Sequence, residues 1–174
     1  MDWYSSIFEL IDMRSFSNLW FWIVLAVAWS TASHWVMGVP YDLVVRARRV
    51  GGPVEADLLD IVRINTNRML QIVEMSGTIL LAMGCFVFTG LATLGFFYGV
   101  EFAQALFLLL FPMTLVMFIN IFHARRLRRQ DLTLERVAKT LLRCRLYTQI
   151  IGMIAILVTS LWGMYQNISI GVLG

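Results

Sequence analysis

Residues 75–100 read MSGTILLAMGCFVFTGLATLGFFYGV and contain no acidic or basic side chain. Glu74 precedes this stretch and Glu101 follows it. An α-helix rises about 1.5 Å per residue, so a helix of this length crosses a hydrocarbon core that is about 30 Å thick. The sequence therefore predicts a membrane-spanning helix here, approximately at residues 73–95.

Three further stretches also lack acidic and basic side chains, histidine aside: residues 15–41, 102–124 and 146–174. Each of them is longer than the roughly 20 residues that a helical span requires. We therefore predict three more spans, approximately at residues 17–39, 101–123 and 146–167.

The whole chain is very apolar for its size. Of its 174 residues, 59% are hydrophobic and 14% are charged, and the mean hydropathy is +0.75. A soluble domain carries roughly 25% charged residues, and a small globule cannot hide so much apolar surface. The composition therefore argues against a soluble enzyme, a nucleic-acid-binding module or a disordered chain. The run Ala105–Phe111 also lacks the apolar–polar alternation of a membrane β-barrel strand.

Lysine and arginine are confined to two segments between the spans. Residues 42–74 and 125–145 together hold 13 of the 14 basic residues. The positive-inside rule predicts that both segments are cytoplasmic and that both chain termini lie outside, across a bacterial inner membrane. The basic pI of about 9.2 then reflects contact with anionic lipid headgroups and gives no reason to expect a nucleic-acid partner.

The first basic segment predicts a helical extension of the second span. Residues 54–72 follow a break at Gly51-Gly52-Pro53, where two glycines precede a proline that suits the first turn of a helix. We expect this helix to run or kink into the second span. Its inward face is predicted to consist of Leu58, Val62 and Met69.

The second basic segment predicts a similar extension of the fourth span. Asp131 is placed to cap a helix that continues through Arg145 into that span. The predicted inward residues are Leu134, Ala138, Leu141 and Leu142. A short amphipathic helix at residues 3–11 is expected to lie on the outer interface. The fold class is thus all-α, an integral membrane four-helix bundle with cytoplasmic helical extensions, in one domain over residues 1–174.

Small residues recur in two of the spans. They are Gly77 and Gly84 in the second span, and Gly152, Ala155, Thr159 and Gly163 in the fourth. Such residues let helix backbones approach closely, either within one chain or between subunits. Pro112 is expected to kink the third span because it removes one backbone donor.

Three ionisable side chains fall near the cytoplasmic boundary: His34, Glu74 and His123. Two imidazoles and a carboxylate at a common depth could bind a metal such as Zn²⁺ or relay protons. Alternatively, each side chain reaches headgroups or water by itself. The two cysteines, Cys85 and Cys144, are predicted to be inert thiols. We predict no catalytic residue, no metal ligand and no cofactor.

Three short segments resemble a known family. Residues 1–4 (MDWY), 12–20 (DMRSFSNLW) and 99–107 (GVEFAQALF) are similar to a bacterial family of four-span membrane proteins that is labelled as a component of the Suf iron–sulfur assembly complex. The resemblance covers most of the chain. It implies a partner in iron–sulfur cluster assembly.

Three kinds of function remain open at this point. We favour a non-catalytic accessory or anchoring subunit that interacts with membrane or cytoplasmic proteins, or with further copies of itself. The alternative is a small oligomeric channel or transporter, although residues 79–100 and 102–119 hold little to solvate an ion. An intramembrane enzyme is the third possibility.

Overall fold

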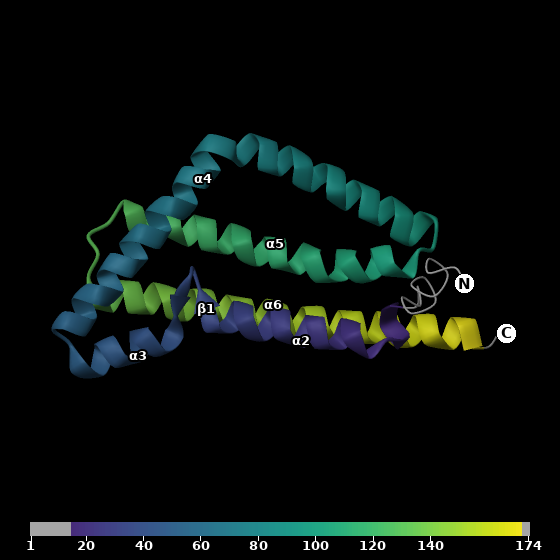
Figure 1. Ribbon diagram of the computed structural model, residues 1–174, viewed down its shortest axis with the longest axis horizontal. Helices are drawn as coiled ribbons and strands as arrows, with labels where there is room; N and C mark the ends of the chain where they lie inside the picture. Colours follow the sequence, from purple (N-terminus) through teal and green to yellow (C-terminus); the bar gives the residue numbers. More distant parts are fainter. Residues whose placement is uncertain (1–14, 172–174) are drawn as a thin grey trace, which may run out of the picture.

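The computed structural model describes residues 15–171 of the chain, and side chains up to residue 168. The helix predicted at residues 3–11 lies outside the described residues. The predicted all-α class is confirmed: five α-helices make up most of the described chain (Figure 1). In chain order the elements are η1 (Ser15–Ser17), α2 (Leu19–His34), β1 (Trp35–Val36), β2 (Val39–Pro40), α3 (Tyr41–Val50), α4 (Pro53–Ala92), η2 (Thr93–Phe97), α5 (Glu101–Arg128) and α6 (Leu134–Gly171).

Three of the four predicted spans lie in helices that are long and apolar enough to cross a membrane. These helices are α4 continued by η2, α5, and α6. In Figure 1, α5 runs antiparallel to both α4 and α6, and α2 lies along α6. The α4–α5 turn, the start of α2 and the end of α6 therefore lie at one end of the molecule, and α3 lies at the other. α5 remains one helix through Pro112.

The first predicted span is shorter than expected, which corrects the predicted range 17–39. Helix α2 has 16 residues and ends at His34, so it is about 24 Å long. It ends there because β1 and β2 pair as an antiparallel ribbon around Met37 and Gly38, which both have positive φ (54° and 73°). That is the two-residue turn that suits a tight hairpin. The amide of Asn65 on α4 donates to the Gly38 carbonyl at 2.9 Å and fixes the ribbon.

The helical extension at residues 54–72 is confirmed, and it is continuous with the second span. Gly51 and Gly52 have φ of 67° and 58°, which separates α3 from α4, and Pro53 occupies the first turn of α4. From there α4 continues for 40 residues. Figure 1 shows that it changes direction about midway along its length. Ser76-Gly77, a pair of the kind at which helices bend, lies close to this midpoint.

The second extension is confirmed with two corrections. Helix α6 begins at Leu134, and the amide of Val137 donates to the Thr133 carbonyl. Thr133 therefore holds the N-cap position that was predicted for Asp131. Leu142 is 45% exposed although it was predicted to point inward, because it lies next to the buried Leu141 and so faces a different direction around the helix.

The basic end of the molecule has a core like that of a soluble domain. We call residues 35–74 and 121–145 the head; they comprise the ribbon, α3, the first half of α4, the end of α5 and the start of α6. One continuous hydrophobic cluster joins these segments. Its most deeply buried members include Val36, Val39, Ala47, Leu58, Val62, Leu70, Ala124, Val137, Ala138 and Leu141. Leu58 and Val62 thus lie on the inward face predicted for them, and Met69 packs against the same cluster.

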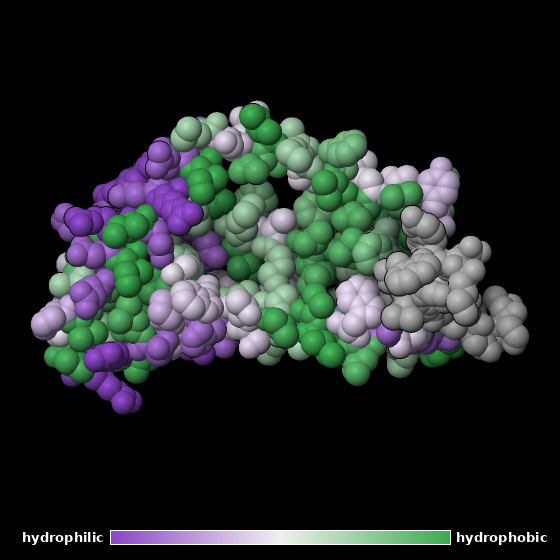
Figure 2. Space-filling model, in the orientation of Figure 1, coloured by the Kyte–Doolittle hydropathy of each residue, from purple (hydrophilic) through white to green (hydrophobic). Residues whose placement is uncertain are grey.

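The rest of the described chain, which we call the apolar half, is packed far less tightly. In the most apolar 18-residue stretch of the α4–η2 helix, only 6% of the residues are buried. The side chain of Phe86 is 80% exposed. In Figure 2 green apolar side chains cover this part of the surface, while purple polar side chains gather on the head. Exposed apolar area on this scale is typical of a helix that contacts lipid or another membrane helix.

The small residues of α6 serve packing within the chain. A Cβ added at Gly152 would lie 2.8 Å from a ring carbon of Trp29 on α2, and one at Gly163 would lie 3.3 Å from Phe16. Gly152 therefore allows α2 to approach α6 closely, and Gly163 does the same for η1. The glycines of α4 differ, because a Cβ at Gly84 would meet no atom of the chain within 4 Å.

Candidate functional site

The charged groups of the protein gather on the head. Thirteen of the 14 lysine and arginine residues belong to it, against seven carboxylates. Figure 2 shows the resulting polar end, which is opposite the α4–α5 turn. Cavities open on this end beside α3 and between α5 and α6, and a smaller one lies between α4 and α5. Several cations line each of the first two cavities, so the head is the candidate functional site.

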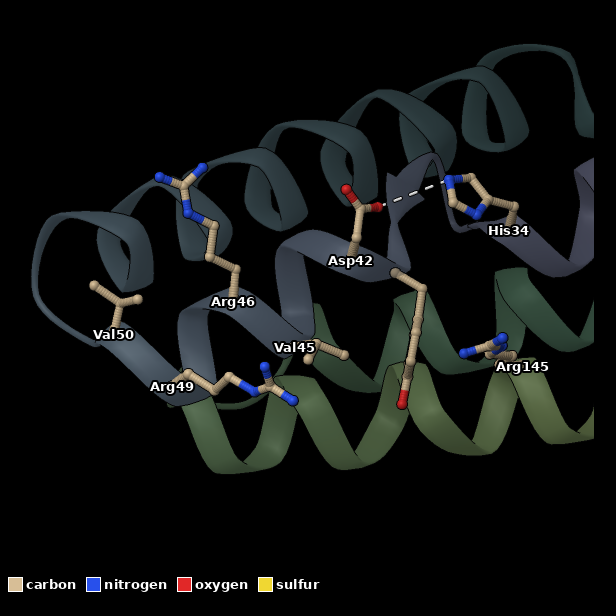
Figure 3. Close-up of a pocket in the computed structure, with 8 residues that line it drawn as sticks. His34, Asp42, Val45, Arg46, Arg49, Val50 and Arg145 are labelled. Carbon is tan, nitrogen blue, oxygen red and sulfur yellow. Dashed lines mark ion pairs between the residues drawn. The ribbon is translucent and has the colours of Figure 1, made fainter.

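The first cavity, which we call the α3 cavity, has a volume of about 530 Å³. Its wall combines three guanidinium groups with a single carboxylate. Asp42 Oδ1 lies 3.7 Å from His34 Nε2, and Figure 3 shows the two side chains pointing toward one another. The lining residues are His34, Tyr41, Asp42, Val45, Arg46, Arg49, Val50 and Arg145.

Arg145 is the cation best placed to bind a ligand in the α3 cavity. Its guanidinium carbon lies 4.0 Å from the centre of the Tyr41 ring, a cation–π contact that holds the side chain against α3. Its Nε is buried and has no hydrogen-bond partner. The terminal nitrogens of the same guanidinium group can donate to a carboxylate or phosphate oxygen bound in the cavity.

The second cavity, which we call the α5–α6 cavity, has a volume of about 350 Å³. Four cations and no carboxylate line it. His123 stands at its edge, where its Nδ1–H donates to the Ile119 carbonyl at 2.8 Å. The lining residues are His123, Arg126, Leu127, Gln130, Arg136, Lys139, Thr140 and Arg143.

The three side chains predicted near the boundary each have a separate partner. His34 faces Asp42, Glu74 pairs with Arg128, and His123 bonds to the Ile119 carbonyl. Among residues 15–168 no three or more His, Cys, Asp or Glu side chains form a group that could hold a metal ion. The structure therefore does not bring His34, Glu74 and His123 together.

The two cysteines also lie apart. Cys85 is exposed on α4, and Cys144 is buried in the head. Burial raises the pKa of the Cys144 thiol to about 12, in spite of Arg143 and Arg145 on either side. The thiol is therefore protonated at any physiological pH and is a poor nucleophile.

The cation clusters were not singled out from the sequence, although a signal for one of them was present. Arg136, Lys139 and Arg143 are spaced by three and four residues, which puts them on one face of a helix. Arg126 follows His123 by three residues on the facing helix. What the sequence could not show is that these two faces meet, because that depends on how α5 and α6 pack.

The apolar half holds one buried polar cluster, at the end opposite the head. The Gln104 amide donates to the Gly95 carbonyl at 2.7 Å. The side-chain oxygen of Gln104 accepts hydrogen bonds from Trp162 Nε1 at 2.9 Å and from Gln166 Nε2 at 2.6 Å. A Cβ at Gly95 would lie 3.0 Å from Gln104, so the glycine permits the close approach. This cluster ties the α4–α5 turn to α6, and its satisfied geometry marks it as structural.

Comparison with known proteins does not assign a family. No protein-family model, curated protein or solved structure matches this chain. The function therefore has to be argued from the residues of the head and from the surface of the apolar half.

Proposed function

We propose that the protein is an anchoring or accessory subunit of a membrane complex, and that its head faces the cytoplasm and binds an acidic surface of another protein. The observation that carries this proposal is the segregation of charge. Every lysine and arginine of the described residues lies on the head, while the helices that leave it are apolar on all sides. The positive-inside rule places such an end in the cytoplasm.

The proposal includes four membrane spans, with α2 as the shortest. Leu19, Ile23 and Val27 of α2 point outward and are exposed. The opposite side of α2 packs through Trp29 against Gly152 of α6, which is itself a candidate span. A helix that is apolar outward and packed on a spanning helix is best accommodated within the membrane. The ribbon and η1 then lie near the two interfaces.

The α3 cavity is the proposed contact for the acidic partner. Arg46, Arg49 and Arg145 line it, and guanidinium groups bind carboxylates through paired hydrogen bonds. Asp42 is the single carboxylate in its wall and is already paired with His34. Binding is favoured over catalysis because the planar fork of a guanidinium group suits recognition of an oxyanion.

Affinity purification from mild detergent tests this proposal. We expect the wild-type chain to retain a partner with an acidic surface, and the double variant Arg46→Glu/Arg49→Glu to lose it. Arg48→Glu is the matched control, because Arg48 is on the same helix but does not line the cavity. A wild-type chain that always purifies alone, or a control that loses the partner equally, would contradict the proposal.

The resemblance to the family labelled as a Suf component suggests which partner to look for. On that basis we propose that the partner belongs to the machinery that assembles iron–sulfur clusters. Mass spectrometry of the co-purified proteins tests this finer proposal. Partners from an unrelated process would refute it and leave the anchoring role intact.

A second candidate function is a small oligomeric channel or transporter. The exposed face of α4 favours it, since Gly90 is exposed, has no neighbour within 4 Å of an added Cβ and would allow another subunit to approach closely. Ion flux into liposomes that contain the protein tests this function, with His34→Ala as the control variant. Flux no higher than that of empty vesicles would exclude it.

A further inference from the structure

The α5–α6 cavity is built to attract an anion. Arg126 projects from α5, and Arg136, Lys139 and Arg143 project from α6. None of the ion pairs among the described residues involves any of these four cations. Four like charges around one hollow repel each other, and an oxyanion placed between them would relieve this repulsion. Thr140 and Gln130 supply further hydrogen-bond donors in the same wall.

An apolar groove of about 310 Å³ lies between the same two helices in the apolar half. Only apolar side chains line it. They are Phe107, Leu108, Phe111, Pro112 and Leu115 from α5, and Ile151, Ile154, Ala155 and Val158 from α6. Its chemistry suits a hydrocarbon chain.

Helix register places the cavity and the groove along one seam. Residues spaced by three or four positions share a face of a helix. On α5 this face carries His123, Ile119, Leu115 and Pro112, and on α6 it carries Arg143, Tyr147, Ile151 and Ile154. The edge of the cavity at His123 and the edge of the groove at Leu115 are eight residues apart, about 12 Å along the helix axis.

Two aromatic side chains occupy the interval between the cavity and the groove. The rings of His123 and Tyr147 lie 6.0 Å apart, one on each helix of the seam. Side chains with an apolar body and a polar tip favour the level of the membrane interface. From the head outward, the seam therefore presents cations, then interfacial rings, then apolar side chains.

We propose that this seam binds one anionic phospholipid, with its phosphate in the α5–α6 cavity and an acyl chain in the apolar groove. The order of groups along the seam matches that of a lipid molecule: phosphate, glycerol, hydrocarbon. Basic pockets between spanning helices on the cytoplasmic side are known places for anionic headgroups. A headgroup with its own ammonium group is disfavoured, because the four cations repel it. The proposal requires a membrane location but not the anchoring role.

Native mass spectrometry of the protein released from mild detergent provides the test, with phosphatidylglycerol and phosphatidylcholine as the probes. We expect one phosphatidylglycerol molecule to remain bound and phosphatidylcholine to be lost. The double variant Arg126→Gln/Arg143→Gln is expected to weaken phosphatidylglycerol binding by about tenfold or more. The control Arg48→Gln/Arg68→Gln removes two charges of the head that line neither cavity and is expected to leave binding within about twofold.

A second arm tests the groove and the source of the phosphate. Ile154→Trp fills the groove and is expected to release the lipid, whereas Leu157→Trp, which points elsewhere on α6, is expected to retain it. Inorganic phosphate at millimolar concentration is not expected to displace the lipid.

Displacement by phosphate without an effect of Ile154→Trp would assign the cavity to a free anion and overturn the lipid proposal. Equal binding of both lipids, or equal loss in the Arg48/Arg68 control, would overturn it too. Loss of the protein partner in the Arg46→Glu/Arg49→Glu variant does not affect the measurement of lipid binding. Either proposal can therefore fail without the other.

Discussion

Helices α4, α5 and α6 run through both the head and the apolar half, yet the two regions bury their side chains in opposite ways. In the head, apolar residues such as Leu58 and Leu141 are buried, and every cation except Arg145 is exposed. In the apolar half the outward side chains are themselves apolar, as at Phe86 and Ile154. Helix α4 changes from the first pattern to the second near Glu74. Burial of apolar surface from water therefore stabilises the head, while specific close contacts must hold the apolar half together.

Truncation of a large apolar side chain is expected to change the free energy of unfolding very differently in the two regions, and this is the largest of the predicted effects. Leu58→Ala removes a fully buried side chain from the head core and should lower the free energy of unfolding by about 2–5 kcal/mol. Phe86→Ala removes an exposed side chain and should change it by less than about 0.5 kcal/mol. Denaturant titration in mixed micelles measures both changes. Equal losses would mean that the surface of α4 is covered by a protein partner.

The next largest change in stability is expected from glycine-to-alanine variants, which compare how closely α6 and α4 are packed. Gly152→Ala places a methyl group against the buried Trp29 ring and should cost about 1–3 kcal/mol of stability. Gly84→Ala meets open space and removes a glycine from a helix interior, so it should be neutral or stabilising. The same unfolding titration compares the two. A destabilising Gly84→Ala would show that the hollow between α4 and α5 is occupied.

A smaller effect is expected at the polar cluster opposite the head. Gln104→Leu removes the acceptor of Trp162 and the donor to Gly95, and it should cost about 1–2 kcal/mol. Thr114→Val is the control, because that hydroxyl bonds only to a carbonyl of its own helix. The shift of the thermal unfolding midpoint in detergent is the measurement. No difference between the two variants would mean that Gln104 does not hold the α4–α5 turn.

Cysteine-to-serine variants are expected to change stability least. The maleimide labelling of the remaining cysteine then reports how accessible each region is. In a Cys85→Ser variant, Cys144 should react with maleimide only after unfolding, because it is buried and its pKa of about 12 keeps it protonated below that pH. In a Cys144→Ser variant, the exposed Cys85 should react with an apolar maleimide in the folded state. Mass spectrometry over time follows the labelling. Rapid labelling of Cys144 in the folded protein would show that the head core opens.

The comparison also explains what the sequence could predict. Charge-free stretches locate membrane helices because any charge inside the hydrocarbon is costly, so three of the predicted spans coincide with long apolar helices. The inward positions of Leu58 and Val62 followed from helical period. The early end of α2 was missed because Met37 is an ordinary span residue that takes a positive φ only in the context of Gly38 and Asn65.

The candidate site was less predictable than the fold. Sequence position predicts the depth of a side chain in a membrane, and it predicts a common depth for His34, Glu74 and His123. It does not give the direction of a side chain around the bundle, and these three point to different partners. The seam between α5 and α6 was hidden for the same reason, since each helix face was visible but their contact was not.

The bend of α4 has a consequence for the bilayer as a whole. At the bend α4 stands away from α5, and it meets α5 again at η2, so the outline of the molecule narrows away from the head (Figure 1). An apolar hollow of about 280 Å³, lined by Gly77, Gly84 and Phe118, lies between the two helices. If the long helices span a bilayer, a protein with this outline displaces more lipid from one leaflet than from the other. A shape of this kind would then favour a curved bilayer over a flat one.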